Sequence, residues 1–255
     1  MKYILTFYSQ EPVMVPASYN KILQAALLSW LGNRGYASFL HDRGYQRDKR
    51  SFKLYTFSEI MGESFYHREK RKRIFTGPVQ ICLTFYSDEG HQVIAEAVER
   101  RRSLRLGNNY LQLVDCRLVM EEYRNCVVEA LSPVTIHSTL TTGDGRKKTY
   151  FYSPTEKDFS GMLGDNLLRK YKAYYGVEPE NTDFKILPDT SGRLREIKTY
   201  YSGFQIRAWK GRFKLYGSAE MIELALLSGI GARNSIGFGC LIQKEMLYPF
   251  GHPAY

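Results

Sequence analysis

Residues 2–120 contain segments with the hydrophobic pattern of a strand and segments with the hydrophobic pattern of a helix, and the order of these segments constrains the fold. Four runs have the composition of strands: 2–8, 52–58, 79–86 and about 110–120, and 79–86 also alternates apolar and polar residues. Two stretches instead space their apolar residues as helices do. One follows Ser18 as its N-cap and ends at Gly32, and the other covers 89–104. The order strand, helix, strand, strand, helix, strand predicts a ferredoxin-like domain.

The second half repeats this alternation less regularly. Strand-like runs at 126–133 and 148–153 precede a helix that Thr155 and Asp158 are expected to open as a capping box. A hairpin is expected across Lys210-Gly211, followed by a helix at 219–228 that Ser218 caps and a strand at 238–244. The expected fold is α+β, with two tandem ferredoxin-like, RRM-like domains at 1–122 and 123–255. Their junction falls in the polar "EEYRN".

The charge of the chain favours a polyanionic partner. Lys and Arg number 36 against 26 Asp and Glu, which gives a formal net charge of +10. Much of the excess is clustered in four short runs: 67–73, 99–105, 145–148 and 169–172. Clustered cations bind nucleic-acid phosphates and release counterions, whereas a scattered excess would serve solubility alone. The 20 tyrosines and 14 phenylalanines could stack on bases, although core packing is the commoner role for any one of them.

Several other classes of protein are disfavoured. The four cysteines show no C-x-x-C spacing, so neither a zinc site nor a disulfide framework is indicated. No run of about 18 apolar residues could span a membrane, and the N-terminus lacks a signal-peptide cleavage site. We therefore expect a cytoplasmic protein with no membrane association.

The segment "LLSGIGARNSIGFGCLI" (226–242) places two Gly-X-Gly pairs around a polar centre. It lacks the dinucleotide pattern G-x-G-x-x-G, and no Walker loop occurs in the chain, so no cofactor is expected. Two readings stay open. The glycines could expose backbone N–H groups to an anion, or Gly229 could simply end a helix before the last strand.

This segment is similar to the C-terminal glycine-rich loop of the CRISPR repeat-processing endoribonucleases of the repeat-associated (RAMP) superfamily. The similarity includes both glycine pairs, the central "RNS" and Phe238. Three further segments agree in order and spacing: "YNKILQAALL" (19–28), "LHDRGYQRDKRSFKLYTFS" (40–58) and "LSP" (131–133). The resemblance implies tandem ferredoxin-like domains and metal-independent cleavage of CRISPR precursor RNA within its repeats.

The resemblance also implies the catalytic residues. His41 coincides with the family's catalytic histidine, and Lys53 with a basic residue beside the scissile phosphate. The first-helix tyrosine of some members is replaced here by Ser29 and Trp30. Tyr36 and Tyr45 are nearby substitutes, of which Tyr36 is the candidate retained. The other histidines show no visible partner: His67, His91, His137 and His252.

We expect RNA contacts from the glycine segment and from the strands before it. The candidate residues are Gly229, Gly231, Arg233, Asn234, Ser235, Gly237, Gly239, Lys198, Arg207 and Lys210. The expected partner is CRISPR repeat RNA; subunits of a CRISPR effector complex and a second copy of the chain are further candidates. The competing hypotheses are a non-catalytic RNA-binding subunit of an effector complex and a generic nucleotide-binding protein. His41 and Lys53 favour the enzyme over the first, and the missing nucleotide motifs weaken the second.

Overall fold

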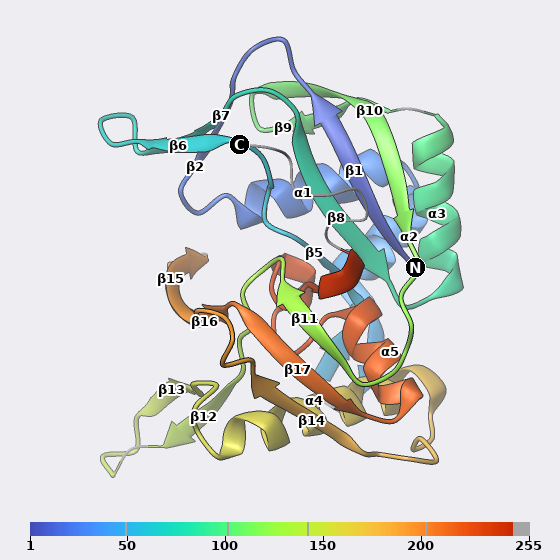
Figure 1. Cartoon of the computed structure of the whole chain (residues 1–255), viewed down its shortest axis with the longest axis vertical. Helices are drawn as coiled ribbons and strands as arrows, with labels where there is room; N and C mark the ends of the chain where they lie inside the picture. Colours follow the sequence, from blue (N-terminus) through green and yellow to red (C-terminus); the bar gives the residue numbers. More distant parts are fainter. Residues whose placement is uncertain (49, 101, 142, 202, 247–255) are drawn as a thin grey trace.

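The computed structural model describes residues 1–246 except 49, 101, 142 and 202. The chain forms a mixed fold of helices and antiparallel sheets. Figure 1 shows the N-terminal half above the C-terminal half, each built around one large sheet. Among the described residues, no helix is both long enough and apolar enough to cross a membrane.

The first sheet has five antiparallel strands. Their order across the sheet is β5 (Tyr55–Phe57), β8 (Val79–Phe85), β1 (Lys2–Tyr8), β10 (Asn109–Val119) and β9 (Leu104–Leu106). Helices α1 (Asn20–Leu31) and α3 (Asp88–Glu99) share its hydrophobic core. Leu5 of β1 and Ile81 of β8 lie in that core with Leu27 and Ile94 of the helices. As expected, α1 ends at Gly32, which adopts a left-handed φ of 72°.

The second sheet has four antiparallel strands. Their order is β14 (Phe184–Pro188), β17 (Arg212–Gly217), β11 (Cys126–Ala130) and β18 (Leu241–Gln243). Helices α4 (Asp158–Tyr175) and α5 (Ala219–Ser228) pack with this sheet. Ser218 caps α5 as expected, because its side chain accepts a hydrogen bond from the Met221 N–H at 3.3 Å.

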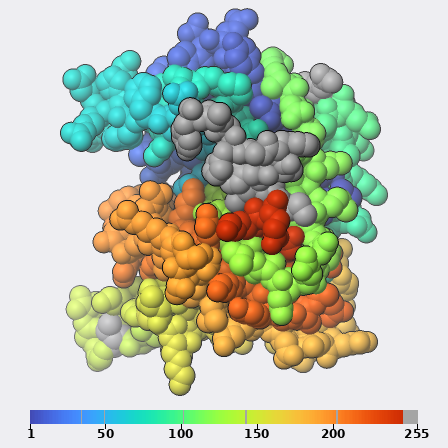
Figure 2. All heavy atoms as spheres, in the orientation of Figure 1, coloured from blue at the N-terminus to red at the C-terminus, as the bar shows by residue number. Residues whose placement is uncertain are grey.

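Smaller strands and helical turns surround the two sheets. The remaining strands pair as β2 (Val13–Pro16) with β7 (Lys72–Phe75), β7 with β6 (Ser64–His67), β3 (Tyr45–Arg47) with β4 (Arg50–Phe52), β12 (His137–Thr141) with β13 (Lys147–Phe151), and β15 (Arg195–Tyr201) with β16 (Phe204–Lys210). The remaining helical pieces are α2 (Arg34–Ser38), η1 (Phe39–Arg43), η2 (Asn234–Ile236) and η3 (Lys244–Met246). In Figure 2 the cyan β6–β7 hairpin and the orange β15–β16 hairpin project on the same side of the molecule.

The two halves meet through a shared apolar cluster. Ile4, Cys82 and Val119 of the first sheet are buried against residues of the second half, namely Leu131, Cys240 and Ile242. Beside this cluster, the fully buried Lys2 ammonium forms an ion pair with Glu121. Residues 122–125, where the sequence places the domain junction, lie between β10 and β11.

The predicted hairpin across Lys210-Gly211 is wrong. Strand β16 pairs with β15, whereas β17 pairs with β11 and β14. The chain therefore leaves one sheet and enters another at Gly211. A Cβ at this glycine would lie 2.8 Å from the carbonyl oxygen of Arg193, so close backbone approach explains the residue.

Two predicted helix caps are also wrong, and one predicted strand is interrupted. Tyr19 precedes α1, and the Ser18 hydroxyl lies instead 3.4 Å from Thr199 Oγ1 of β15. Helix α4 has no side-chain cap, because Glu156 accepts from the backbone N–H of Ser153, at 2.6 Å, and the helix begins after Lys157. The expected strand at 52–58 is divided at Leu54, whose positive φ of 49° separates β4 from β5.

Candidate active site

His41 lies on the π-helical turn η1, between α2 and β3. The turn is anchored by the buried side chain of Leu40, whereas the His41 side chain is 71% exposed. His41 Nδ1 lies 2.7 Å from Asp42 Oδ1, and the Ser38 hydroxyl donates to Asp42 Oδ2 at 2.9 Å. Asp42 therefore holds an exposed imidazole in a defined orientation.

The Asp42 carboxylate also determines which ring nitrogen of His41 carries hydrogen. The hydrogen bonds from His41 and Ser38 lower the pKa of the Asp42 carboxyl, so it is ionised at neutral pH. An ionised carboxylate can only accept hydrogen bonds, and Nδ1 must therefore be the donor. This leaves Nε2 of the neutral ring as a proton acceptor directed away from Asp42.

Lys53 joins the same cluster through a close approach of the backbone. Gly44, which ends η1, has a φ of 64°, and a Cβ there would lie 2.7 Å from Lys53 Cδ. Only glycine lets the stem of Lys53 pass so close. Partial burial lowers the pKa of the Lys53 ammonium, while the charge of Asp42 acts to raise it. His41, Asp42 and Lys53 therefore form one group of interacting side chains.

A pocket of about 690 Å³ opens beside this group. His41 and Asp42 line it, together with Ser29 and Asn33 at the end of α1 and with Arg102. The Arg102 guanidinium lies over Gly32, where a Cβ would come within 2.1 Å of Nη1. The pocket thus combines a histidine, a cation and polar side chains on a concave surface.

Tyr36 does not join this group, which corrects its selection as a catalytic candidate. Its side chain is buried, and its hydroxyl lies 2.8 Å from the Ser87 hydroxyl at the start of α3. Burial raises the pKa of this phenol. Tyr45, the other substitute, is half-buried and packs its ring against Phe39 and Tyr174. Tyr36 is therefore a core residue.

The glycine segment is packed inside the protein instead of lying open to an anion. All four of its Gly-X-Gly glycines, at 229, 231, 237 and 239, have positive φ and are buried. The N–H of Gly239 donates to the Pro133 carbonyl, and that of Gly237 to the Asn234 carbonyl, both at 2.9 Å. A Cβ at Gly239 would come within 2.0 Å of the Ile230 carbonyl oxygen. The expectation that these glycines contact RNA is corrected: they permit tight packing.

Asn234 is also structural, and the backbone of Ser235 is held in place. Asn234 is buried, and its side-chain amide donates to the carbonyls of Ile230 and Phe238, each at 3.0 Å. The Ser235 carbonyl accepts from the Tyr55 hydroxyl at 3.1 Å. Two further bonds fasten the segment to the first half: Thr56 Oγ1 to the Phe238 carbonyl, at 2.9 Å, and Asn20 Nδ2 to the Ile236 carbonyl, at 2.9 Å. Of the central "RNS", the half-buried side chains of Arg233 and Ser235 remain candidates for RNA.

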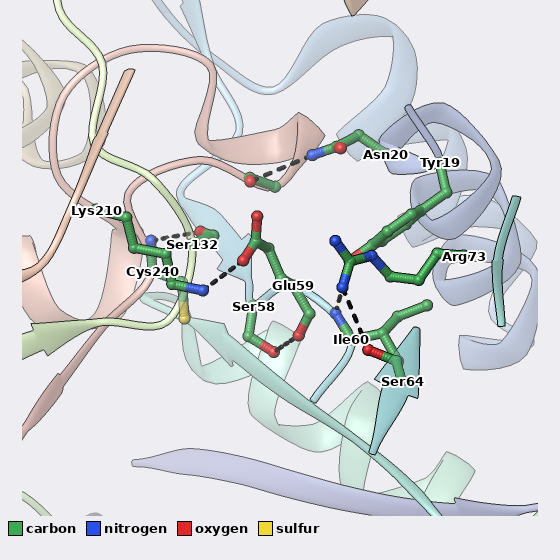
Figure 3. A network of polar contacts seen from close by, with 11 residues as sticks. Tyr19, Asn20, Ser58, Glu59, Ile60, Ser64, Arg73, Ser132, Lys210 and Cys240 are labelled. Atoms are coloured by element: carbon green, nitrogen blue, oxygen red, sulfur yellow. Dashed lines mark hydrogen bonds and ion pairs between the residues drawn. The ribbon is translucent and has the colours of Figure 1, made fainter. Parts of the chain in front are cut away.

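A second concave surface, of about 440 Å³, lies between the two halves and is called here the interdomain groove. Its lining includes four cations and one carboxylate: Arg73, Arg195, Lys198, Lys210 and Glu59. Figure 3 shows Lys210 in an ion pair with Glu59 and Arg73 bonded to Ser64. Lys198 and Lys210, both predicted from the sequence, therefore line one surface.

Arg207 does not line this groove. Its Nε donates to Glu196 Oε1 at 2.5 Å, and its guanidinium lies 5.9 Å from the centre of the Trp209 ring. The sequence analysis missed Asp42, Arg73 and Arg195. Asp42 could have been found from its position beside His41, whereas the two arginines become neighbours only when the halves pack together.

Comparison with known proteins shows similarity to Cas6 proteins. Residues 118–242 match the model described as "CRISPR associated protein Cas6, C-terminal". A relative named CRISPR-associated endoribonuclease Cas6 1, from Methanocaldococcus jannaschii, is 26% identical over 93% of this chain and 87% of its own. A Pyrococcus furiosus relative, named CRISPR-associated endoribonuclease Cas6, is 27% identical over 88% of this chain and 82% of its own. Over most of its length the chain is similar to Cas6 endoribonucleases, and residues 118–242 match the Cas6 C-terminal model.

Solved structures share the same fold over nearly the whole chain. The structure titled as a Cas6-related gene from Pyrococcus furiosus has a TM-score of 0.80 at 21% identity, covering 96% of this chain and 98% of that one. Another, titled an RAMP protein binding different RNA substrates, has a TM-score of 0.78 at 20% identity, covering 95% and 99%. These likenesses place the described sheets and helices in the Cas6 fold.

Proposed function

We propose that this protein is an endoribonuclease of the Cas6 family that cuts CRISPR precursor RNA within its repeats. The observation that carries the proposal is the exposed His41 ring, held at Nδ1 by Asp42 and grouped with Lys53. The two curated relatives named CRISPR-associated endoribonucleases support it. A non-catalytic RNA-binding subunit would have no need of such a group.

The group supplies the parts of a metal-independent cleavage. His41 Nε2 takes the proton of the 2′-hydroxyl next to the scissile phosphate, and the 2′-oxygen forms a bond to phosphorus. The bond from phosphorus to the 5′-oxygen then breaks. The Lys53 ammonium neutralises the charge on the phosphorane and gives its proton to the leaving oxygen; its lowered pKa makes it a better acid. The products are a 2′,3′-cyclic phosphate and a 5′-hydroxyl.

The interdomain groove is the proposed path for RNA approaching the cut. Its four cations outnumber its single carboxylate, and Lys198 and Arg195 are exposed to solvent. Phosphate contacts of this kind position an RNA without reading its sequence. Asn20 of α1 lines this groove and Leu28 lines the pocket beside His41; eight residues apart, they lie on the same face of the helix. One RNA strand could therefore follow α1 from the groove to His41.

The architecture supports the proposed tandem arrangement. If the short edge strand β9 and the small hairpin strands are set aside, the chain order in each half is strand, helix, strand, strand, helix, strand. In the first main sheet β1 then lies between β8 and β10, and in the second β11 lies between β17 and β18. This order is that of a ferredoxin-like domain, so we propose two such domains with a junction at 122–125. A homodimer, effector-complex subunits and a cytoplasmic location remain predictions.

The test is incubation of the wild-type protein and of His41→Ala with a cognate repeat RNA in EDTA. We expect the wild type to cut once and to leave a cyclic phosphate. His41→Ala should cut about 10²–10⁴-fold more slowly, since it lacks its general base. Its RNA affinity should stay close to that of the wild type. Binding without cleavage by the wild type would favour the non-catalytic subunit instead.

A further inference from the structure

A cluster of polar side chains lies where the glycine segment passes the chain leading into β12. The N–H of Ala232 donates to the Thr135 carbonyl at 2.8 Å, and a Cβ at Gly231 would lie 2.4 Å from that oxygen. The next residue of the segment is Arg233, and two residues beyond Thr135 is His137. These backbone contacts bring the two side chains to one place.

Two nitrogen atoms in this cluster have no hydrogen-bond partner among the described residues. They are His137 Nδ1 and Arg233 Nε, and both atoms are buried. A buried polar nitrogen without a partner costs about 1–3 kcal/mol. The backbone at Arg233 also has a φ of 64°, which arginine rarely adopts. The protein therefore holds an under-satisfied guanidinium beside an under-satisfied imidazole.

A second arginine, Arg50, acts on this cluster from the first half. Burial, together with the positive charges of Arg233 and Arg50, lowers the pKa of the His137 ring. Arg50 belongs to β4, the strand that leads to Lys53. Among the described residues, neither Arg50 nor Arg233 forms an ion pair with a carboxylate. Like charges gathered without a counterion favour a bound anion.

Through Tyr201 the cluster is linked to α1, whose residues line both the interdomain groove and the pocket beside His41. Tyr201, whose hydroxyl donates to Gln24 of α1 at 3.2 Å, lies close enough to Arg233 to affect its pKa. Gln24 is four residues after Asn20, which lines the groove, and four before Leu28, which lines the pocket. None of Arg50, His137 and Arg233 lines the pocket itself.

We propose that Arg50, His137 and Arg233 bind one backbone phosphate of the RNA, separate from the phosphate that is cut. The anion accepts hydrogen bonds from His137 Nδ1 and Arg233 Nε and a charge-assisted contact from Arg50. This site rests on the proposed function, because it is placed along the same RNA. It assigns His137 to RNA binding and gives Arg233 a defined partner.

The experiment uses repeat RNAs that each carry one uncharged methylphosphonate linkage, scanned along the strand. We expect one linkage, away from the cut, at which neutralisation weakens wild-type binding about 10-fold, about 1.4 kcal/mol. His137→Gln and Arg233→Gln should bind native RNA about 10-fold more weakly and lose no further affinity at that linkage. Arg124→Gln, an exposed arginine paired with Glu122 in the junction between the two halves, is the matched control and should bind normally.

The proposal is overturned if both variants, folded as judged by thermal melting, bind native RNA like the wild type. It is also overturned if, at every neutralised linkage, the two variants lose as much RNA affinity as the wild type loses. A second measurement is independent of RNA cleavage: inorganic pyrophosphate should shift the His137 ring signals in NMR spectra of the wild type but not of Arg233→Gln. Wild-type protein that responds to pyrophosphate but does not cut RNA contradicts the proposed function and retains the anion site. Absence of the pyrophosphate shift overturns the site.

Discussion

Lys170 Nζ of α4 lies 2.7 Å from Asn234 Oδ1, and both side chains are buried. The same ammonium donates to the Gly229 carbonyl at 2.6 Å. Asn234 in turn bonds two carbonyls of the glycine segment, which is fastened to β5 by Thr56. A single buried lysine thus supports the segment that joins the two halves.

Replacing Lys170 with methionine should destabilise the protein by about 2–4 kcal/mol. The methionine keeps the aliphatic stem but leaves Asn234 Oδ1 unpaired in the interior and the Gly229 carbonyl with only the 3.3 Å hydrogen bond from the Ser228 hydroxyl. Urea unfolding measures the change. Lys172→Met is the matched control on the same helix: Lys172 pairs with the exposed Glu178, and its loss should change stability by less than about 1 kcal/mol. Equal midpoints for the two variants would contradict the supporting role of Lys170.

The stability of the protein should rise as the pH is raised from about 7 towards 10. Burial lowers the pKa of Lys170 to about 7, whereas an unfolded lysine titrates near 10.4. Between these values the unfolded chain binds the additional proton, so raising the pH favours the folded state. As the pH rises across this range, the urea midpoint of the wild type should increase relative to that of Lys170→Met. Parallel midpoints would count against the shifted pKa.

Gly239→Ala should be far more damaging than Gly145→Ala. Both glycines have positive φ, 71° and 79°, so alanine is strained at each. A Cβ at Gly239 would also lie 2.0 Å from the Ile230 carbonyl oxygen, whereas a Cβ at Gly145 would meet no atom within 4 Å among the described residues. We expect a loss of about 1 kcal/mol at Gly145 and about 3 kcal/mol or more at Gly239. If thermal unfolding shows similar losses of stability for the two variants, the positive φ alone would explain the loss and the contact with Ile230 would not contribute.

Asp42→Asn should slow cleavage by at least about 10-fold without changing RNA affinity. Asparagine can present an N–H to His41 Nδ1 and so stabilise the wrong tautomer, with hydrogen on Nε2. Single-turnover cleavage rates measure this effect apart from binding. Ser38→Ala removes only one of the hydrogen bonds to Asp42 and should have a smaller effect. A larger loss for Ser38→Ala than for Asp42→Asn would contradict the orienting role.

The sequence predicted the periodic elements and the loop that carries His41, because apolar spacing and local chemistry determine both. It did not predict which strands pair across Gly211, since that depends on close backbone approach to Arg193. It also misassigned Asn234 and Tyr36. A polar side chain in a glycine-rich loop has the same sequence pattern whether it faces RNA or a buried lysine. Only the packed fold separates Asn234, which bonds Lys170, from Arg233, which keeps an unpaired nitrogen.

The most direct test of the account compares two repeat RNAs in EDTA, identical except for one 2′-deoxy nucleotide at the cleavage position. The 2′-hydroxyl is the nucleophile in the mechanism centred on His41 and Lys53. The account predicts that the all-ribose RNA is cut to a 2′,3′-cyclic phosphate, while the deoxy RNA is bound but left intact. Cleavage of the deoxy RNA at the same position and rate, or cleavage of the all-ribose RNA only without EDTA, would contradict it.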